Sequence, residues 1–206
     1  MVSAVLAHDL LWGMGPAQLP ADAPAWARAV LTEGQPVVVR RALAAAGQVA
    51  VGVRGPLREQ RYACFMAVES ISRCVRPEEL CHVECARDLP ALGALAQVRG
   101  LLDDSGLIWG VSGSAGFELA SGVRALHEQS DLDLILRTPE PLGRGLARAL
   151  LQQLEAVECR VDLQLQTPQG AVALAEWAGT SSRVLLKNAR QACLVSDPWQ
   201  PLECAA

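Results

Sequence analysis

The sequence has little of what marks a nucleic-acid-binding or membrane protein. Its formal net charge is −4 and Lys187 is its only lysine, so it lacks the basic face of a sequence-independent DNA or RNA binder. No apolar run approaches the roughly 20 residues that span a bilayer. The first residues carry no basic stretch and reach His8 and Asp9 too early for a secretory signal. We therefore expect a soluble, cytoplasmic protein with no nucleic-acid or membrane partner.

The seven cysteines also lack the even count and regular spacing of a disulfide framework, so reduced thiols are expected. Cys81-His-Val-Glu-Cys85, with Cys74 nearby, superficially suggests a zinc site. Its spacing fits no common zinc finger and no second ligand pair follows, which favours small buried residues. With 51% hydrophobic and 19% charged residues, the 206-residue chain is typical of a globular protein of one large or two small domains.

Hydrophobic periodicity predicts an α/β or α+β protein with two domains, residues 1–90 and 91–206. In the first half, 36–41 and the alternating Val49, Val51 and Val53 indicate strands. Residues 58–66 fit a strand or a helix equally well. The boundary is placed near 85–105, where a turn-rich stretch begins the second half. There, expected strands at 107–112, 131–137, 159–166 and 184–187 alternate with helices near 116–126, 139–157 and 169–178.

Two carboxylates share one face of the expected strand 131–137. The strand period of two sends Asp131 and Asp133 to one side and the intervening leucines to the other. Like charges this close raise each other's pKa unless a cation neutralises them. Oxygen ligands suit Mg²⁺ or Mn²⁺, so the pair predicts a divalent metal site. The alternative is a pair of solvated acidic residues on an exposed strand.

A third carboxylate, Asp162, lies on another alternating strand. Val161, Leu163 and Leu165 share one face of it, and Asp162 lies on the opposite face. Neighbouring strands lie about 4.8 Å apart, so Asp162 can join the same metal cluster if the two strands are adjacent.

Upstream, Ser112-Gly113-Ser114 ends a strand and opens an expected helix. Glycine lets the backbone approach a phosphate, the helix N-terminus offers free N–H groups, and the serines add hydroxyl donors. A phosphate cradle beside a metal-binding carboxylate pair is what phosphoryl or nucleotidyl transfer requires. The ordered set of strand, Gly-Ser, helix, strand and Asp-x-Asp, with a third Asp later, resembles the polymerase-β-type nucleotidyltransferase superfamily. The alternative is a turn beside an exposed sheet edge.

A closer resemblance extends over nearly the whole chain. The matching segments are His8-Asp-Leu-Leu-Trp12, Val38-Val-Arg-Arg41, Val51-Gly-Val-Arg-Gly55 with Arg58 and Arg61, Trp109-Gly-Val-Ser-Gly-Ser-Ala-Gly-Phe-Glu-Leu-Ala-Ser-Gly122, Ser130-Asp-Leu-Asp-Leu134, Val161-Asp162, Ala173-Leu-Ala-Glu-Trp177, Leu185-Leu-Lys187 and Asp197-Pro-Trp199. They resemble the phosphoribosyl-dephospho-CoA transferases, the holo-acyl-carrier-protein synthases of malonate decarboxylase. Between Lys187 and Asp197 the family usually carries Gly-Pro, whereas this chain has Asn-Ala-Arg-Gln-Ala-Cys, which alters the expected loop geometry.

The resemblance implies a polymerase-β-type catalytic domain with a mixed sheet, a smaller N-terminal α+β domain, and a specific reaction. The donor would be 2′-(5″-triphosphoribosyl)-3′-dephospho-CoA and the acceptor a serine of the apo acyl carrier subunit. The serine oxygen attacks the α-phosphorus and diphosphate leaves. Asp131 and Asp133 match the family's catalytic aspartates and are interpreted as metal ligands; Asp162 would complete the cluster or help to deprotonate the serine.

Basic residues supply further candidates. Arg40, Arg54 and Arg58 are interpreted as ligands of the donor's phosphates or of an acidic carrier, because guanidinium forks suit phosphate oxygens. Solvated surface positions explain any one of them equally well. Lys187 could reach a phosphate or be an ordinary surface lysine, and His127 could be a base or a loop histidine.

Two rival functions remain open at this point. One is a small nucleotidyltransferase that uses ATP or another NTP on a different acceptor. The other is a non-catalytic assembly factor of malonate decarboxylase, against which the intact Asp131 and Asp133 argue.

Overall fold

The computed structural model describes residues 5–201, and the chain divides into two compact units. The first is Met1–Arg76 with Ala120–Val123, and the second is Pro77–Leu119 with Arg124–Ala206. Both units combine helices with a β-sheet, which confirms the predicted α+β class. The division after Arg76 falls ahead of the boundary expected at residue 90. Residues 77–80 belong to the second unit because they pack on its first strand, as described below.

The first unit contains a five-stranded antiparallel sheet in the order β4-β3-β2-β1-β5. Its elements are β1 (Leu10–Trp12), η1 (Pro16–Gln18), α1 (Ala25–Thr32), β2 (Val37–Val39), β3 (Gln48–Arg54), β4 (Arg61–Ala67), η2 (Val68–Ser70) and β5 (Arg73–Val75). The expected strands at 36–41 and around Val49–Val53 are confirmed as β2 and β3. Residues 58–66, for which periodicity could not decide, are mostly strand, because β4 pairs with β3 along its whole length.

The core of the first unit follows from the alternation in β3. Val49, Val51 and Val53 point to one face, where they pack with the apolar side of α1, including Ala27 and Leu31. The opposite face of β3 carries Gly52 and Arg54, which are only half-buried. Burial of one face fixes the register of the hairpin, because a slip of one residue would exchange the two faces.

The second unit contains a six-stranded mixed sheet in the order β11-β10-β9-β8-β7-β6. Its elements are η3 (Pro77–Leu80), α2 (Pro90–Asp104), β6 (Ile108–Val111), α3 (Gly113–Ser121, of which Ala120 and Ser121 are grouped with the first unit), β7 (Leu132–Arg137), α4 (Arg144–Leu154), β8 (Val161–Thr167), β9 (Gly170–Ala173), α5 (Leu174–Ala178), β10 (Val184–Lys187) and β11 (Ala192–Val195). Among the strands that the structure describes in this sheet, only β7 and β8 pair in parallel, and α4 connects them. This is the helical crossover that a parallel pair requires.

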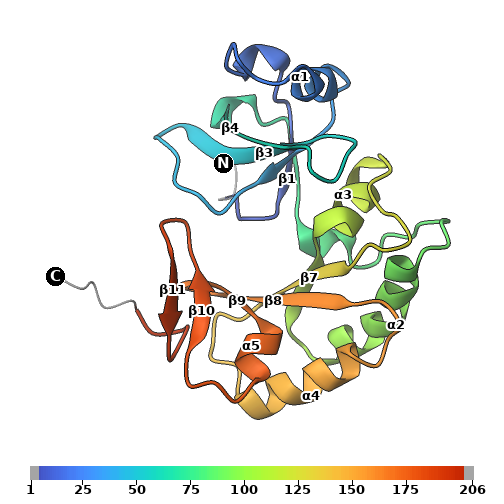
Figure 1. Ribbon diagram of the computed structural model, residues 1–206, viewed down its shortest axis with the longest axis vertical. Coiled ribbons are helices and arrows are strands. Elements are labelled where there is room, and N and C mark those ends of the chain that lie inside the picture. The colour runs from blue at the N-terminus through green and yellow to red at the C-terminus, as the bar shows by residue number, and fades with distance from the viewer. Residues whose placement is uncertain (1–4, 202–206) are drawn as a thin grey trace. The chain divides into compact units, whose positions relative to one another are not determined.

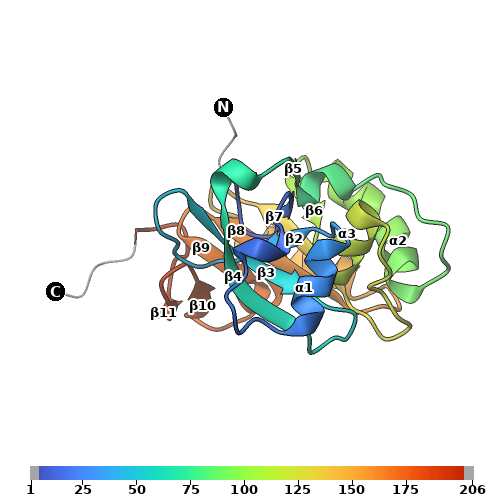
Figure 2. The same ribbon diagram turned by 90° about the horizontal axis from the view of Figure 1, so that it is seen from above.

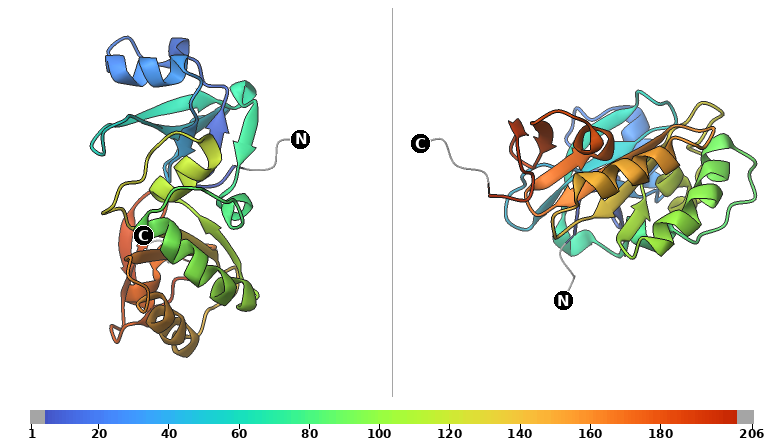
Figure 3. Two further views of the ribbon diagram at one scale, coloured as in Figure 1. Left: turned by 90° about the vertical axis from the view of Figure 1, so that its right-hand side faces the viewer. Right: turned by 90° about the horizontal axis from the view of Figure 1, so that it is seen from below.

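Helices cover one face of this sheet. In Figure 1, α4 and α5 lie on one side of β7 and β8 while α3 lies on the other, and the view from below in Figure 3 shows α2 and α4 running across the covered face. The leucines of β7 point to that face: Leu132, Leu134 and Leu136 are at most 1% exposed. In Figure 2 the same strands are seen from above. No helix within residues 5–201 is long and apolar enough to cross a bilayer.

The short helix η3 covers part of the opposite face. A Cβ built on Gly110 of β6 would lie 2.5 Å from the backbone carbon of Pro77 and 2.6 Å from the nitrogen of Glu78, so only glycine allows this approach. The Arg137 guanidinium of β7 donates to Glu78 at 2.6 Å. These contacts join residues 77–80 to the second unit and explain why its boundary precedes the sequence-based one.

Three expected elements of the second half are wrong in their bounds. The helix expected at 169–178 is strand β9 followed by the short α5, because Thr167 and Gly170 form a hairpin turn: Thr167 Oγ1 accepts the Gln169 and Gly170 N–H groups at 3.2 and 3.3 Å. Helix α3 covers 113–121 rather than 116–126. Helix α4 starts at Arg144, because Thr138 still belongs to the sheet and donates its N–H to Gln166 at 3.0 Å.

Candidate active site

The parallel pair β7–β8 brings two of the predicted carboxylates together. Asp133 and Asp162 are register partners, so the adjacency that the sequence analysis assumed is confirmed. Partners in neighbouring strands point to the same face. Asp131 directly precedes β7 and lies two residues before Asp133. We call the sheet face that carries Asp133 and Asp162, with Asp131 at the residue before β7, the carboxylate face.

The start of α3 abuts Asp133. Gly113 has a φ of +60°, and a Cβ built on it would overlap Oδ2 of the Asp133 carboxylate, so a glycine is required here for both reasons. Ser112 is buried; its N–H and Oγ donate to the Asp133 carbonyl at 2.9 and 3.3 Å. Ser112 thus fixes the strand to the helix start, and half-buried Ser114 follows in the first turn. The helix N-terminus, which favours anions, therefore lies beside the carboxylate face.

The aspartates suit a divalent cation that completes its shell with other oxygens. Within residues 5–201, no three His, Cys, Asp or Glu side chains lie close enough to hold one metal ion. Mg²⁺ is usually bound by one or two carboxylates together with substrate phosphates and water, so Asp131 and Asp133 fit that need. Asp162 already has a cationic partner, because the Arg160 guanidinium donates to its Oδ1 at 3.0 Å.

A cleft of about 230 Å³ opens where β8 begins. Asp133, Arg160, Asp162 and Gln164 supply its polar lining, and leucines of α4 and the start of α5 supply its apolar lining. Two of the three predicted aspartates thus border a space that a ligand can enter.

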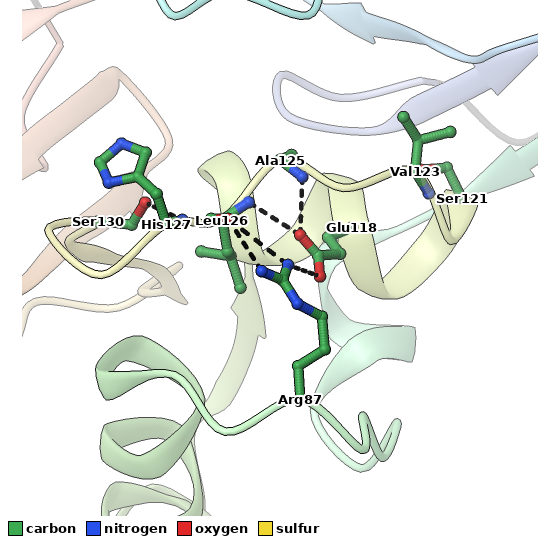
Figure 4. Close-up of polar contacts among 8 residues, drawn as sticks. All are labelled: Arg87, Glu118, Ser121, Val123, Ala125, Leu126, His127 and Ser130. Carbon is green, nitrogen blue, oxygen red and sulfur yellow. Dashed lines mark hydrogen bonds and ion pairs between the residues drawn. The ribbon is translucent and has the colours of Figure 1, made fainter.

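A buried ion pair holds the segment that leads into β7 (Figure 4). Glu118 of α3 is 5% exposed and accepts the Ala125 and Leu126 N–H groups at 2.7 and 2.8 Å, while Arg87 donates to it at 2.5 Å. Burial raises the pKa of Glu118, but these hydrogen bonds and the Arg87 charge outweigh it and hold the pKa below the ordinary value. One helix therefore carries the Gly113 terminus and anchors the approach to Asp131.

Sequence reasoning missed this Glu118–Arg87 pair. Glu118 appeared only as one letter of a matching segment, and no periodicity links it to a residue 31 positions earlier. His127 follows the anchored segment; it is exposed, and its Nδ1 accepts the Gln129 N–H at 3.1 Å.

Lys187 lies on the carboxylate face but away from the aspartates. It is the register partner of Ala171, which in turn pairs with Gln166 on the face of Asp162. From the strand geometry, Lys187 lies roughly 10 Å across the sheet and 13 Å along it from Asp162. The structure thus brings this lysine to the same face, two strands from the carboxylates.

The predicted arginines gather in the first unit, on the open face of the β3–β4 hairpin. Arg54 is the register partner of Arg61, and the Cδ of Arg40 lies 3.5 Å from a Cβ built on Gly52. Arg61 is exposed overall, yet partial desolvation of its guanidinium and then the neighbouring charge of Arg58 lower its pKa. We call this group, Arg40, Arg54, Arg58 and Arg61, the arginine face.

The Asp197-Pro-Trp199 segment has a structural role. Trp199 donates its indole N–H to the Thr138 carbonyl at 2.8 Å and packs edge-on against Trp177, with ring centroids 5.0 Å apart. Trp177 donates to the Leu142 carbonyl at 2.7 Å, and the Arg144 guanidinium lies 4.1 Å from its ring centroid. The two indoles hold the 138–143 connection between β7 and α4.

The cysteines of residues 5–201 form no disulfide. They are free thiols, as expected, and they form no metal-binding group with neighbouring ligands. Cys81 is buried, and burial raises its pKa to about 12, which makes it an unreactive core residue.

An α+β fold with paired carboxylates beside a helix N-terminus defines a site typical of enzymes that transfer phosphoryl or nucleotidyl groups. Comparison with known families agrees. The family model described as the phosphoribosyl-dephospho-CoA transferase MdcG N-terminal domain matches residues 6–77, and the corresponding C-terminal domain model matches residues 79–198. The chain belongs to the phosphoribosyl-dephospho-CoA transferase family and is a transferase.

Curated relatives bear the same name. A phosphoribosyl-dephospho-CoA transferase of Pseudomonas fluorescens is 69% identical over 100% of both chains. That of Pseudomonas aeruginosa is 56% identical over 97% of this chain and 96% of its own, and that of Azotobacter vinelandii is 55% identical over 94% and 93%. No solved structure matches the chain.

Proposed function

We propose that this transferase moves the phosphoribosyl-dephospho-CoA group from 2′-(5″-triphosphoribosyl)-3′-dephospho-CoA to a serine of the apo acyl carrier subunit of malonate decarboxylase. Membership of the phosphoribosyl-dephospho-CoA transferase family supports the identity of the transferred group. The observation that carries the chemistry is the register pairing of Asp133 with Asp162 beside the Gly113 helix terminus. The pairing of aspartates with an anion-favouring helix start suits a polyphosphate held by a cation.

In the proposed reaction, the serine oxygen forms a bond to the α-phosphorus and the bond from that phosphorus to the bridging oxygen of the β-phosphate breaks. Diphosphate leaves with the electron pair, and the serine proton passes to a base, for which Asp162 is a candidate. A bound Mg²⁺ or Mn²⁺ would neutralise the polyphosphate and align the attacking and leaving oxygens. Asp131 and Asp133 would hold that ion, and the Gly113 and Ser114 N–H groups would face phosphate oxygens.

The arginine face and Lys187 enter the proposal as donor ligands. Guanidinium groups bind phosphate oxygens in a bidentate manner, and four of them share one hairpin face of the first unit. Lys187 lies on the carboxylate face at a distance that suits a part of the donor remote from the reacting phosphorus.

Incubation of the pure protein with Mg²⁺, apo carrier subunit and each donor in turn tests the proposal. We expect diphosphate release and a carrier mass increase equal to the phosphoribosyl-dephospho-CoA group with the triphosphoribosyl donor, and neither with ATP. Diphosphate release with ATP alone would identify an NTP-using nucleotidyltransferase instead. No turnover with any donor, in the presence of an intact metal site, would favour an assembly factor.

A further inference from the structure

Asp162, the third aspartate of the carboxylate face, forms an exposed ion pair with Arg160. Arg160, the residue before β8, donates through Nε and Nη2 to Oδ1 of Asp162 at 3.2 and 3.0 Å. The side chains are 71% and 44% exposed. Both residues line the 230 Å³ cleft together with Asp133.

The backbone of Arg160 is fixed, whereas its side chain is not. The Arg160 carbonyl accepts the Leu132 N–H at 2.9 Å, which ties it to the start of β7. The guanidinium donates to Asp162 and is otherwise mostly in solvent. An ion pair between exposed side chains contributes little to stability, so a more strongly charged anion can take the guanidinium.

The pairing is in conflict with metal binding at Asp162. A guanidinium next to a carboxylate repels a divalent cation that approaches the same oxygens. Asp162 is the register partner of Asp133 and therefore stands on the correct face for a shared cation, yet no three-ligand group forms among residues 5–201. Moving the Arg160 side chain away from Asp162 would remove the repulsion without any change in the backbone.

We infer that Arg160 is a phosphate-binding residue that exchanges Asp162 for the donor's polyphosphate when the donor enters the cleft. The fork of the guanidinium matches phosphate oxygens, and a triphosphate carries more negative charge than one carboxylate. The exchange frees Asp162 for the cation or the acceptor serine only while donor is bound. This inference rests on the proposed function, because it uses a polyphosphate donor and a cation at Asp131 and Asp133.

Binding measurements on the full chain test the exchange without turnover. Electron paramagnetic resonance of Mn²⁺ reports the metal affinity of the donor-free protein, and calorimetry with inorganic tripolyphosphate reports the phosphate site. For Arg160→Ala we expect several-fold tighter Mn²⁺ binding and about tenfold weaker tripolyphosphate binding. Arg160→Lys should restore part of the tripolyphosphate affinity, because it keeps the charge and loses the fork.

A second substitution isolates the role of Asp162. Adding Asp162→Asn to Arg160→Ala should abolish the gain in Mn²⁺ affinity, whereas Asp162→Asn alone should leave the donor-free Mn²⁺ affinity near that of the unmodified chain. Arg148→Ala, at an exposed position of α4, is the matched control and should change neither value.

The two proposals fail in different ways. If Arg160→Ala leaves both Mn²⁺ and tripolyphosphate binding unchanged, the exchange is wrong whatever the reaction. If both shifts appear but the triphosphoribosyl donor gives no product, the exchange stands and the proposed donor is wrong. If Asp131→Ala, Asp133→Ala binds Mn²⁺ as tightly as the unmodified chain, the metal proposal fails and the exchange fails with it.

Discussion

The carboxylate face and the arginine face place charge in two different ways. The aspartates have short side chains on or next to paired strands, and their positions follow from the β7–β8 register and from the glycine at the start of α3. The arginines are long side chains on a hairpin, where Arg40, Arg58 and Arg61 are exposed. Short side chains on paired strands hold the carboxylate oxygens in nearly fixed positions, as reacting groups require. The arginine face offers charge over a wider area, as substrate capture requires.

This difference predicts a large loss of activity from the aspartates. Asp131→Ala and Asp133→Ala should each lower kcat about a thousandfold, because loss of a metal ligand removes several kcal/mol of transition-state stabilisation. The thermal unfolding temperature should stay close to that of the unmodified chain, since neither carboxylate belongs to the apolar core. Carrier modification by intact mass and thermal unfolding measure the two effects. Unimpaired modification by the double variant would rule out the metal mechanism.

A substitution next to the aspartates tests whether backbone position matters as much as charge. Gly113→Ala should lower kcat about a hundredfold and the free energy of unfolding by about 1–2 kcal/mol, because the added Cβ is strained at a φ of +60° and overlaps the Asp133 carboxylate. Gly145→Ala in α4 is the control: its Cβ meets no atom within 4 Å. The control should keep full activity and slightly raise the unfolding temperature. Equal behaviour of both variants would show that Gly113 tolerates a side chain.

How much of this could be predicted from the sequence depends on how far apart the interacting residues are. Period-two alternation is local, so it correctly assigned Asp133 and Asp162 to strand faces, whereas the adjacency of their strands was inferred from the order of the strands along the chain. The 169–178 helix was wrong because an Ala- and Val-rich run suits a helix or a strand, and the Thr167 turn decides between them. Glu118 could not be linked to Arg87, because only tertiary packing brings the pair together.

Substitution of Glu118, which anchors the segment leading into β7, should lower activity by an intermediate amount. Glu118→Ala should lower kcat/KM about tenfold and the free energy of unfolding by roughly 2–4 kcal/mol, since it removes the acceptor of two N–H groups and leaves Arg87 without its counter-ion, with only the Leu126 carbonyl as acceptor among the contacts of Figure 4. Glu118→Gln keeps one carbonyl acceptor and should lose less of each. Glu128→Gln, at an exposed position of the following loop, should change neither.

The same pair predicts a pH dependence of stability. Because the pKa of Glu118 is lower in the folded than in the unfolded chain, its contribution is fully present above the unfolded value of about 4.5 and is lost as the pH falls through the folded value. Glu118→Gln should therefore lose less stability than the unmodified chain on acidification below pH 4.5, measured by urea unfolding at a series of pH values. Parallel curves for the two proteins would show that Glu118 does not titrate differently on folding.

The arginine face should give the smallest effects and the most salt-dependent ones. Arg40→Ala, Arg54→Ala and Arg58→Ala should each raise the KM for the donor about three- to tenfold and leave kcat nearly unchanged, because side chains remote from the reacting phosphorus bind ground state and transition state alike. The increase should shrink at high ionic strength, where the charges are screened. Initial rates over a donor titration at two salt concentrations measure both, with Arg148→Ala as control. A loss confined to kcat would place these arginines at the reacting phosphorus, and the contrast between the two faces would disappear.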